Sequence, residues 1–308
     1  MAPLEGLERY AGLLPVDERP AFRAATERPL PAVVWVNPLR GAPEAVEAEI
    51  RARCPEAVPL GWRPHAWRLP ADARPAGWPA YLLGQLHIQE EAALWAADLL
   101  GAAPGERVLD LCAAPGNKTA QLACAMQDRG SLWAVDRAHG RLMAVRRTME
   151  RLGVTCAAVI CDDAARLRGL PEGTFDRVLA DVPCTGEGTT RKAPGKGRRV
   201  EVTPGERAQA AALQLRILRR GLAALRPGGV LVYSTCTYAP EENEAVLDAL
   251  PPGLAVLEPV APPAGLRTRP GVTTFEGRSY RPEVALAHRL WPQDNDTGGF
   301  FVARLRRI

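Results

Sequence analysis

One short stretch, RVLDLCAAPGNKT at residues 107–119, limits most strongly what this chain can fold into. Residues 107–111 are a candidate buried strand, residues 112–116 are too small and too interrupted for a regular element, and residues from 119 onward favour a helix. A strand, a tight turn and a helix in this order place free backbone N–H groups and a helix N-terminus at the carboxyl end of a parallel strand. The stretch therefore predicts an α/β fold with a site for a small polar ligand.

The strand–helix alternation continues along the chain. Strands are expected at 107–111, 131–135, 156–161, 175–182 and 229–234, and helices at 118–127, 139–152, 206–225 and 240–250. Such alternation predicts an α/β domain with a mainly parallel sheet. Residues 254–258 and 299–305 are strand-like without a helical pattern between them, which predicts an antiparallel edge pair.

Residues 1–80 have a different pattern and are expected to form a separate small lobe, followed by a main domain over residues 81–308. Short helices are expected at 4–14, 19–26 and 44–53, a strand at 32–37, extended or irregular chain at 55–79, and a helix at 86–101. Trp62, Trp67 and Trp78 lie in the irregular segment. Two roles are open for them: packing between the lobes, or stacking against RNA bases.

Composition excludes several classes of protein. Hydrophobic residues make up 47% of the chain and charged residues 24%, as in soluble globular proteins. No apolar run approaches the roughly 20 residues of a membrane span, and no secretory signal is expected. We expect a cytoplasmic protein, and we also expect a monomer. The seven cysteines include no CxxC pair, which favours reduced thiols over disulfides or a metal site.

Positive charge is concentrated in one segment. The net charge is only +4, but residues 191–220 contain nine Arg or Lys and two Glu. A run of this kind is either a solvated face or a surface that contacts RNA. The chain has only three lysines, Lys118, Lys192 and Lys196, and all three fall in or beside the candidate site.

The acidic residues after the strands favour one cofactor class. Asp136 ends the second strand of the main domain, about 20 residues beyond Gly116, where it can accept hydrogen bonds from a ribose diol. A dinucleotide would require a G-x-G-x-x-G loop, and this loop has only Gly116 in that register, preceded by Pro115. S-adenosylmethionine carries no phosphate and suits a loop of small residues. Asp163, after the third strand, is then placed for the adenine amino group, although such an acid can equally be a helix cap.

Two cysteines follow neighbouring strands of the expected sheet. Cys184 lies in ADVPCTGEG, just after Asp181, and Cys236 lies in YSTCTYAPEENE. If the fourth and fifth strands are neighbours, both thiols emerge at the ligand-binding edge. Each alone could be a small buried hydrophobe. Together with a methyl donor they fit covalent catalysis on cytosine, in which a thiolate adds to C6 and makes C5 nucleophilic. Asp181 could then orient the base, and Lys118 or nearby arginines could lower a thiol pKa.

These motifs resemble the RNA 5-methylcytosine methyltransferases of the Sun/Fmu/NSUN type over nearly the whole chain. The matching segments are DLCAAPGNKT, DVPCTGEG, YSTCTYAPEENE, the lead-in GQLHIQEEAA and the closing WPQDNDTGGFFVARL. The N-terminal PAVVWVNPLRG is similar to the small RNA-recognition-like α+β lobe of the family. The resemblance implies a Rossmann-like class I methyltransferase fold with a seven-stranded, mostly parallel sheet and an antiparallel edge strand.

The resemblance also implies roles for individual residues. Cys236 would be the nucleophile and Cys184 would help to release the product, with Asp181 and Lys118 beside them in the catalytic site. The cofactor or base would be contacted by Cys112, Ala113, Ala114, Pro115, Gly116, Asn117, Lys118, Asp136, Arg141, Asp163 and Asp181. Asn117 and Trp35 depart from the family pattern, which often has Gly and Arg at these positions.

The implied activity is S-adenosylmethionine-dependent methylation of cytosine C5 in structured RNA. The N-terminal pattern favours ribosomal RNA, as in bacterial small-subunit enzymes, with transfer RNA as the alternative. RNA contact is expected from residues 191–220 and from the N-terminal lobe. A non-catalytic RNA-binding or assembly factor and a DNA cytosine methyltransferase are the other hypotheses, and no metal is expected.

Overall fold

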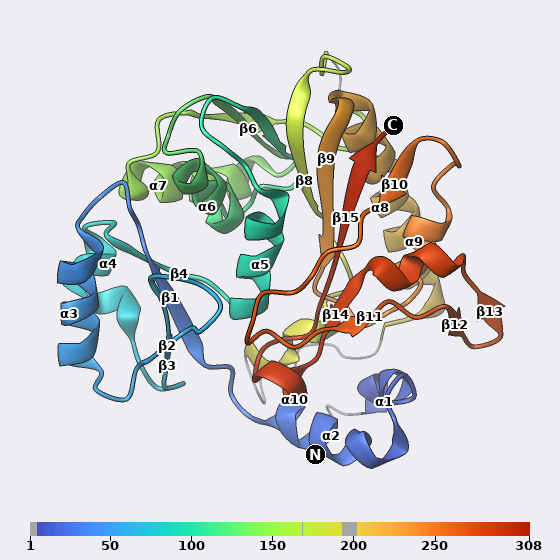
Figure 1. Cartoon of the computed structure of the whole chain (residues 1–308), viewed down its shortest axis with the longest axis horizontal. Coiled ribbons are helices and arrows are strands. Elements are labelled where there is room, and N and C mark those ends of the chain that lie inside the picture. The colour runs from blue at the N-terminus through green and yellow to red at the C-terminus, as the bar shows by residue number, and fades with distance from the viewer. Residues whose placement is uncertain (1–4, 168, 193–201) are drawn as a thin grey trace.

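The structure is a computed structural model that describes residues 5–167, 169–192 and 202–308. Figure 1 shows a large central sheet with helices on both faces and a small lobe, containing α3, α4 and β1–β4, at one side. The helices are α1 Glu5–Ala11, α2 Arg19–Glu27, α3 Pro43–Arg53, α4 Pro79–Leu82, α5 Glu91–Leu100, α6 Asn117–Ala125, α7 His139–Leu152, α8 Pro204–Ala224, α9 Glu244–Asp248 and α10 Pro292–Asn295, with 3-10 turns η1 Val16–Glu18, η2 Pro75–Gly77, η3 Glu187–Lys192 and η4 Pro282–Leu286.

The large sheet has the strand order β11-β14-β15-β9-β8-β5-β6-β7, and β10 pairs with the far end of β15. Strands β7, β6, β5, β8 and β9 are parallel, whereas β15, β14, β11 and β10 join by antiparallel pairing. The strands are β5 Arg107–Asp110, β6 Ser131–Asp136, β7 Ala157–Cys161, β8 Phe175–Asp181, β9 Leu225–Thr235, β10 Ala255–Leu257, β11 Arg269–Pro270, β14 His288–Leu290 and β15 Phe300–Arg307, with a separate hairpin of β12 Thr274–Phe275 and β13 Arg278–Ser279.

Apolar side chains bury both faces of this sheet. On one face, Leu109 and Val178 of the central strands pack against Leu218 and Leu222 of α8 and against α9. On the other face, residues that alternate with them, such as Val108, pack against α5 and α6. This two-sided burial explains why the parallel strands have near-continuous apolar sequences. It also leaves only their carboxyl ends free to present polar side chains.

The expected strand–helix alternation is confirmed for all five parallel strands and for the helices α6 to α9. The antiparallel pairing of residues 254–258 with 299–305 is also present, as β10 with β15. The expected count of seven strands is too small for the described residues, since the short strands β11 and β14 bring this sheet to nine. Strands as short as these leave little periodicity in a sequence, so the pattern of residues did not predict them.

One expectation for the N-terminal part of the chain is wrong, and the structure makes a second one more specific. Residues 86–88 of the expected helix 86–101 form β4 Leu86–Ile88, which pairs with β1 Ala32–Val36, and α5 begins only at Glu91. The segment 55–79, expected to be extended or irregular, contains the extended strands β2 Val58–Pro59 and β3 Ala66–Leu69. Both strands join the antiparallel sheet β2-β3-β1-β4 of the small lobe. Pairing between distant segments, which local periodicity does not encode, decided both cases.

The tryptophans are explained by packing. Trp67 is buried in the core of the small lobe, and Trp78 packs on the same core. Trp62 contacts the cores beneath α5 and α7, and its Nε1 donates a hydrogen bond of 3.1 Å to Glu91 Oε1. Trp62 therefore packs between the small lobe and the main domain, as one of the two alternatives expected, while Trp67 and Trp78 stabilise the small lobe itself.

The first two helices, α1 and α2, lie away from the small lobe and close to the C-terminal segments (Figure 1). Leu7, Tyr10 and Phe22 form a buried cluster with Tyr238 and Trp291. The loop after β9 is thus covered by the N-terminal helices. Within the described residues, no helix is long and apolar enough to cross a membrane.

Candidate functional site

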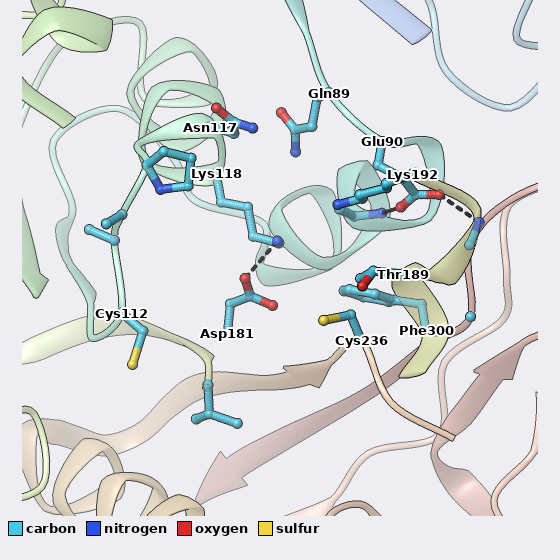
Figure 2. Close-up of a pocket in the computed structure, with 18 of the residues that line it drawn as sticks. Gln89, Glu90, Cys112, Asn117, Lys118, Asp181, Thr189, Lys192, Cys236 and Phe300 are labelled. Atoms are coloured by element: carbon cyan, nitrogen blue, oxygen red, sulfur yellow. Dashed lines mark hydrogen bonds and ion pairs between the residues drawn. The ribbon is translucent and has the colours of Figure 1, made fainter. Parts of the chain in front are cut away.

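A pocket opens at the carboxyl ends of β5, β8 and β9 (Figure 2). Its volume is about 230 Å³. The residues that line it come from the loop after β5, the ends of β8 and β9, η3, the segment before α5 and the start of β15: Gln89, Glu90, Ala93, Asp110, Cys112, Ala113, Ala114, Pro115, Asn117, Lys118, Asp181, Val182, Gly188, Thr189, Lys192, Cys236, Gly298, Gly299 and Phe300. This is the edge at which open α/β sheets bind their ligands.

The loop of residues 112–116 forms one wall of the pocket and is held by Asp136. Asp136 Oδ2 accepts a hydrogen bond of 3.3 Å from Ala114 N, and Oδ1 accepts one of 3.0 Å from Ala138 N. Arg141 donates to Ala114 O at 2.9 Å and lies 3.6 Å from Asp136 Oδ2. Gly116 has φ 108°, and a Cβ there would lie 3.2 Å from Val145 Cα, so only glycine fits without strain.

Asp110 forms the floor of the pocket. It is 1% exposed, and burial raises its pKa to about 7 although the Thr119 hydroxyl donates to Oδ2 at 2.7 Å. Burial also raises the pKa of the neighbouring Cys112 thiol, so this cysteine is a wall of the pocket and not a nucleophile. Cys112 to Lys118 therefore provide shape and backbone groups, as a ligand cradle requires.

Lys118 and Asp181 form an ion pair inside the pocket. Lys118 Nζ lies 2.7 Å from Asp181 Oδ2 (Figure 2). The Ser234 hydroxyl donates to Asp181 Oδ1 at 2.7 Å. Burial disfavours the ammonium, but attraction to Asp181 outweighs it and raises the pKa of Lys118. Both side chains line the pocket, so the ion pair faces any ligand bound there.

The two cysteines meet, as the sequence predicted. Strands β8 and β9 are parallel neighbours with Asp181 opposite Ser234, so Cys184 and Cys236 emerge side by side. Their Sγ atoms are 3.3 Å apart, and Cys236 N donates to Cys184 Sγ at 3.4 Å. Cys236 lines the pocket, and Cys184 lies behind it.

The two thiols are not equivalent. The hydrogen bond from Cys184 lowers the pKa of Cys236, with further help from the positive charges of Lys192 and Lys118, and this outweighs the effect of burial. The same hydrogen bond and burial raise the pKa of Cys184. The geometry therefore favours an S–H···S⁻ pair in which Cys236 carries the negative charge.

Other expected residues lie beside the pocket and do not line it. Asp136, Arg141 and Gly116 support the loop from behind. Asp163 has 41% of its side chain exposed and accepts a hydrogen bond of 3.0 Å from Ala165 N, so it caps the turn that follows β7. Asn117 does line the pocket, and its Oδ1 lies 3.1 Å from His87 Nε2.

Several pocket residues were not selected from the sequence. Gln89 and Glu90 line the pocket, as do residues 188–189 and 298–300. Lys192, which was expected in or beside the site, lines it as well. Glu90 ties two of these segments together, because its carboxylate accepts from Ala93 N at 2.9 Å and from Gly298 N at 3.0 Å. Gly188 fits between Cys236 and Gly299, where an added Cβ would lie 2.2 Å from Gly299 O. These unexpected pocket residues lie in the segments QEEAA, TGEGTT and DTGGFF, but no rule of sequence spacing predicts that the three segments meet at one pocket.

Part of the basic stretch has a structural role. Residues 193–201 lie outside the described residues. Arg191 is only 2% exposed, and its guanidinium donates to the carbonyls of Arg28, Pro29 and Thr297 and pairs with Asp296 at 2.6 Å. Arg191 is therefore excluded from an RNA-contacting surface, because its donors are already used to join η3 to two other segments.

The donor set suits S-adenosylmethionine. A sulfonium cofactor presents positive charge, an amino-acid end and a ribose, and the pocket offers carboxylates, small side chains and loop backbone in reach of one another. Residues 112–118 and Asp110 would hold it, with Asp136 fixing the loop. In the described part of the chain, no cluster of His, Cys, Asp and Glu is arranged for a metal ion.

Comparison with known proteins agrees with this geometry. A family model described as 16S rRNA methyltransferase RsmB/F matches residues 97–306. The tRNA (cytosine(49)-C(5))-methyltransferase of Pyrococcus abyssi is 36% identical over 304 residues, which cover 98% of this chain and 95% of that protein. The ribosomal RNA small subunit methyltransferase F of Aeromonas salmonicida is 34% identical over 320 residues, and the match covers 98% of this chain but only 63% of the relative.

A solved structure shows the same fold over the whole chain. The crystal structure of a methyltransferase homolog protein from Pyrococcus horikoshii has a TM-score of 0.85 and 30% identity, covering 100% of this chain and 99% of that one. The large sheet, the loop after β5 and the cysteine-bearing strands lie within the region that the family model matches. The chain therefore belongs to the RsmB/F family of RNA methyltransferases, enzymes that take S-adenosylmethionine as their cofactor.

Proposed function

We propose that this protein transfers a methyl group to C5 of cytosine in structured RNA, through a covalent bond between Cys236 Sγ and C6 of the base. The observation that carries the proposal is the cysteine pair: Cys236 faces the pocket with a lowered pKa, and Cys184 Sγ lies 3.3 Å behind it. Cytosine C5 is too weak a nucleophile to be methylated without such an addition.

The cofactor supplies an electrophilic methyl group at the pocket. The Cys236 thiolate adds to C6, and the ring electrons thereby become available at C5. Asp181, held by Lys118 and Ser234, would accept a hydrogen bond from the exocyclic amine of the base and so orient the ring, while the Lys118 ammonium would stabilise the negative charge that the thiolate adds to it. After methylation, water takes the C5 proton, the C5–H electron pair forms the C5=C6 double bond, and the electron pair of the breaking C6–S bond returns to Cys236.

Cys184 acts in the release step. Its thiol donates to the sulfur that must leave, and a hydrogen bond to a charged acceptor is stronger than one to a neutral acceptor. The departing thiolate is therefore stabilised by the group that lowers its pKa in the free enzyme. Without this donor, the covalent adduct would persist.

Ribosomal RNA is the first candidate substrate, because the matching family model and the Aeromonas relative are both described by that activity. Transfer RNA is the second candidate, because the Pyrococcus abyssi relative is described as a tRNA enzyme and has nearly the same length as this chain. RNA contact would come from the small lobe and from the exposed basic residues Lys192, Arg216 and Arg219.

The test measures methyl transfer from labelled cofactor to RNA. Cys236→Ala should abolish it, whereas Cys184→Ala should leave a protein–RNA adduct that survives a denaturing gel. Full activity in Cys236→Ala would refute the assignment, and bound RNA without methyl incorporation in the wild type would favour a non-catalytic RNA-binding factor. Bisulfite sequencing of RNA from cells with and without the gene would then separate ribosomal from transfer RNA.

A further inference from the structure

Two buried carboxyl groups, Glu187 and Glu242, lie behind the cysteine pair. They are 2% and 0% exposed, and they belong to the TGEG and PEENE segments, to which the proposed chemistry gives no role. In the described part of the chain, neither makes an ion pair with a cation. Burying two acids without a cation is costly unless hydrogen bonds or protonation remove the charge.

Counting protons shows that the two carboxyl groups are not both ionised. Thr185 Oγ1 lies 2.6 Å from Glu187 Oε2 and within hydrogen-bond distance of Glu242 Oε1. The threonine hydroxyl has one proton and can donate to only one of these oxygens. The other contact therefore needs a proton on a carboxyl group. Glu187 already accepts from the hydroxyls of Tyr10 and Thr237, which is the environment of a carboxylate.

Glu242 has the environment of a carboxylic acid. Its Oε2 accepts from Thr185 N at 3.1 Å and from Gln214 Nε2 at 2.7 Å, as a carbonyl oxygen does, which leaves Oε1 as the hydroxyl that faces Thr185. The chain of donors then runs from Glu242 through the Thr185 hydroxyl to Glu187. Every proton in it has one acceptor.

This network holds the backbone on both sides of Cys184. Thr185 N donates a hydrogen bond to Glu242. The Gln214 amide donates both to Glu242 and, at 2.9 Å, to Pro183 O. Cys184 lies between these two anchored residues, and its sulfur faces Cys236. A change in the charge of Glu242 would therefore act on the S–H···S⁻ pair through its backbone.

We propose that Glu242, protonated and linked through Thr185 to Glu187, is a positioning residue that holds Cys184 opposite Cys236 for the release step. The inference rests on the proposed function for its place in the reaction, but the positioning itself concerns only residues of this chain.

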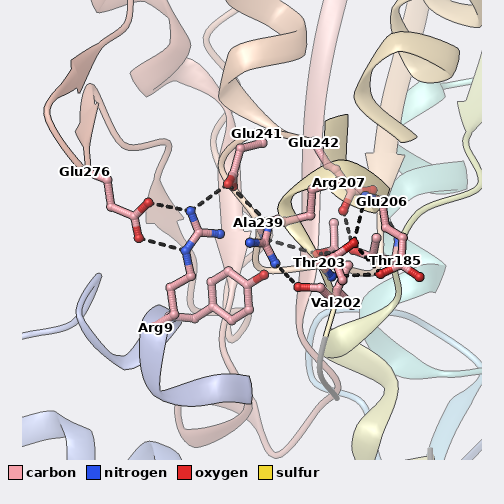
Figure 3. Close-up of polar contacts among 12 residues, drawn as sticks. Arg9, Thr185, Val202, Thr203, Glu206, Arg207, Ala239, Glu241, Glu242 and Glu276 are labelled. Atoms are coloured by element: carbon pink, nitrogen blue, oxygen red, sulfur yellow. Dashed lines mark hydrogen bonds and ion pairs between the residues drawn. The ribbon is translucent and has the colours of Figure 1, made fainter. Parts of the chain in front are cut away.

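The cations near these two acids pair with other carboxylates, and Figure 3 shows Arg9 between Glu241 and Glu276. Glu241, which precedes Glu242 in the sequence, forms ion pairs with two arginines: it lies 2.6 Å from Arg9 and 3.3 Å from Arg207 of α8. Glu244 pairs with Arg289. The titratable and charged groups near Glu242 and Glu187 on the packed elements are Tyr10 and Arg9 of α1, Arg207 of α8, Tyr233 of β9, Tyr238 of the loop after β9, Cys184, Glu241 and Glu244.

The pH at which the network opens follows from Glu242. Burial raises the pKa of Glu242 to about 7, although Thr185 and Gln214 oppose the shift. Above that pH the shared proton is lost, two carboxylates face one hydroxyl, and the negative charge of Glu242 acts on Cys184. Below it the network is complete.

The test uses the full-length protein as wild type, Glu242→Gln, Glu242→Ala and, as matched control, Glu241→Gln. A glutamine amide can donate to Thr185 and accept from Gln214 at any pH, so Glu242→Gln mimics the protonated acid. The first readout is the rate of Cys236 alkylation by iodoacetamide against pH, followed by mass spectrometry without RNA. The second is the fraction of protein trapped as RNA adduct on a denaturing gel.

We expect Glu242→Ala to move the alkylation profile of Cys236 to higher pH and to accumulate adduct several-fold over wild type, as Cys184→Ala does. Glu242→Gln should keep the wild-type profile near pH 6 and lose the rise in adduct that wild type shows above pH 7. Glu241→Gln should behave as wild type. The isosteric Glu242→Gln keeps the test valid if the alanine variant folds poorly.

An unchanged Cys236 profile in folded Glu242→Ala, or the same pH dependence of adduct in Glu242→Gln and wild type, would overturn the inference. A Cys184→Ala variant that traps no adduct would instead overturn the proposed release role of Cys184. The alkylation profile would still decide whether Glu242 positions that thiol, because it needs no RNA.

Discussion

The buried ion pair between Arg289 and Glu244 offers a sharp test of how the loop after β9 is held. Arg289, on β14, is 3% exposed, and Glu244, at the start of α9, is fully buried. The guanidinium donates to both carboxylate oxygens, with Nε 2.7 Å from Oε1, and Nη1 donates to Tyr238 O at 2.9 Å. The proposed perturbation is Arg289→Met, which keeps the length of the side chain and removes its charge.

The expected loss of unfolding free energy follows from the unpaired Glu244 carboxylate that Arg289→Met leaves in the core. Removing one partner of a buried pair leaves an uncompensated charge and costs about 3–5 kcal/mol of unfolding free energy. Replacing both partners in Arg289→Met/Glu244→Met should recover most of the loss, because no buried charge is left. The recovery should fall short by about 1–3 kcal/mol, since Val272 N, which donates to Glu244 Oε1 at 3.0 Å, then lacks an acceptor.

The assay is urea unfolding of the single and double variants at pH 7, with Arg23→Met as the matched control. Arg23 pairs with Glu8 at 2.6 Å in similar geometry, but both side chains are 45% exposed. An exposed pair contributes about 0–1 kcal/mol. The explanation by burial would be refuted if Arg289→Met lost no more unfolding free energy than Arg23→Met. It would also be refuted if the double variant were less stable than Arg289→Met.

Two further predictions concern charge near the pocket. Burial lowers the pKa of His87 from 6.5 to about 4, so the ring stays neutral in the native state, whereas it becomes protonated below pH 6.5 in the unfolded state. The free energy of unfolding should therefore fall as the pH drops from 6.5 to 4. His87→Leu should show a flatter pH dependence when urea unfolding is measured over this range. An equal slope in both proteins would contradict this. Lys118→Met removes a positive charge that lowers the pKa of Cys236 and leaves Asp181 unpaired, so alkylation of Cys236 at neutral pH should slow while that of the exposed Cys161 stays constant as an internal control. Unchanged alkylation of Cys236 would show that Lys118 does not act on the thiol.

Much of the main domain could be predicted because its signals are local. The strands β5 to β9 have apolar runs of the length that two-sided burial requires, and the turn at residues 112–116 is marked by small residues, Pro115 and Gly116. The position of Cys184 and Cys236 at one sheet edge followed from strand order alone. Each of these inferences needs only periodicity and the direction of parallel strands.

The small lobe was harder to predict for a physical reason. Strand β4 is very short, and its partner β1 lies far earlier in the chain, beyond α3, β2, β3 and α4. Its hydrogen bonds therefore depend on a contact that local periodicity does not express. Arg191 shows the same limit for charge. A run of basic residues predicts a solvated or RNA-binding face, but only the fold places the carbonyls of Arg28, Pro29 and Thr297 around this guanidinium.

The sequence by itself determined the α/β class, the cofactor loop and the two thiols, because these depend on residue type and spacing within short segments. The tertiary structure alone decided the chemistry between them. The contact of 3.3 Å between Cys184 and Cys236, the ion pair of Lys118 with Asp181, and the proton shared by Glu187 and Glu242 all join segments that lie far apart in the chain. Burial and distance set the charge of each group, and both exist only once the strands have assembled.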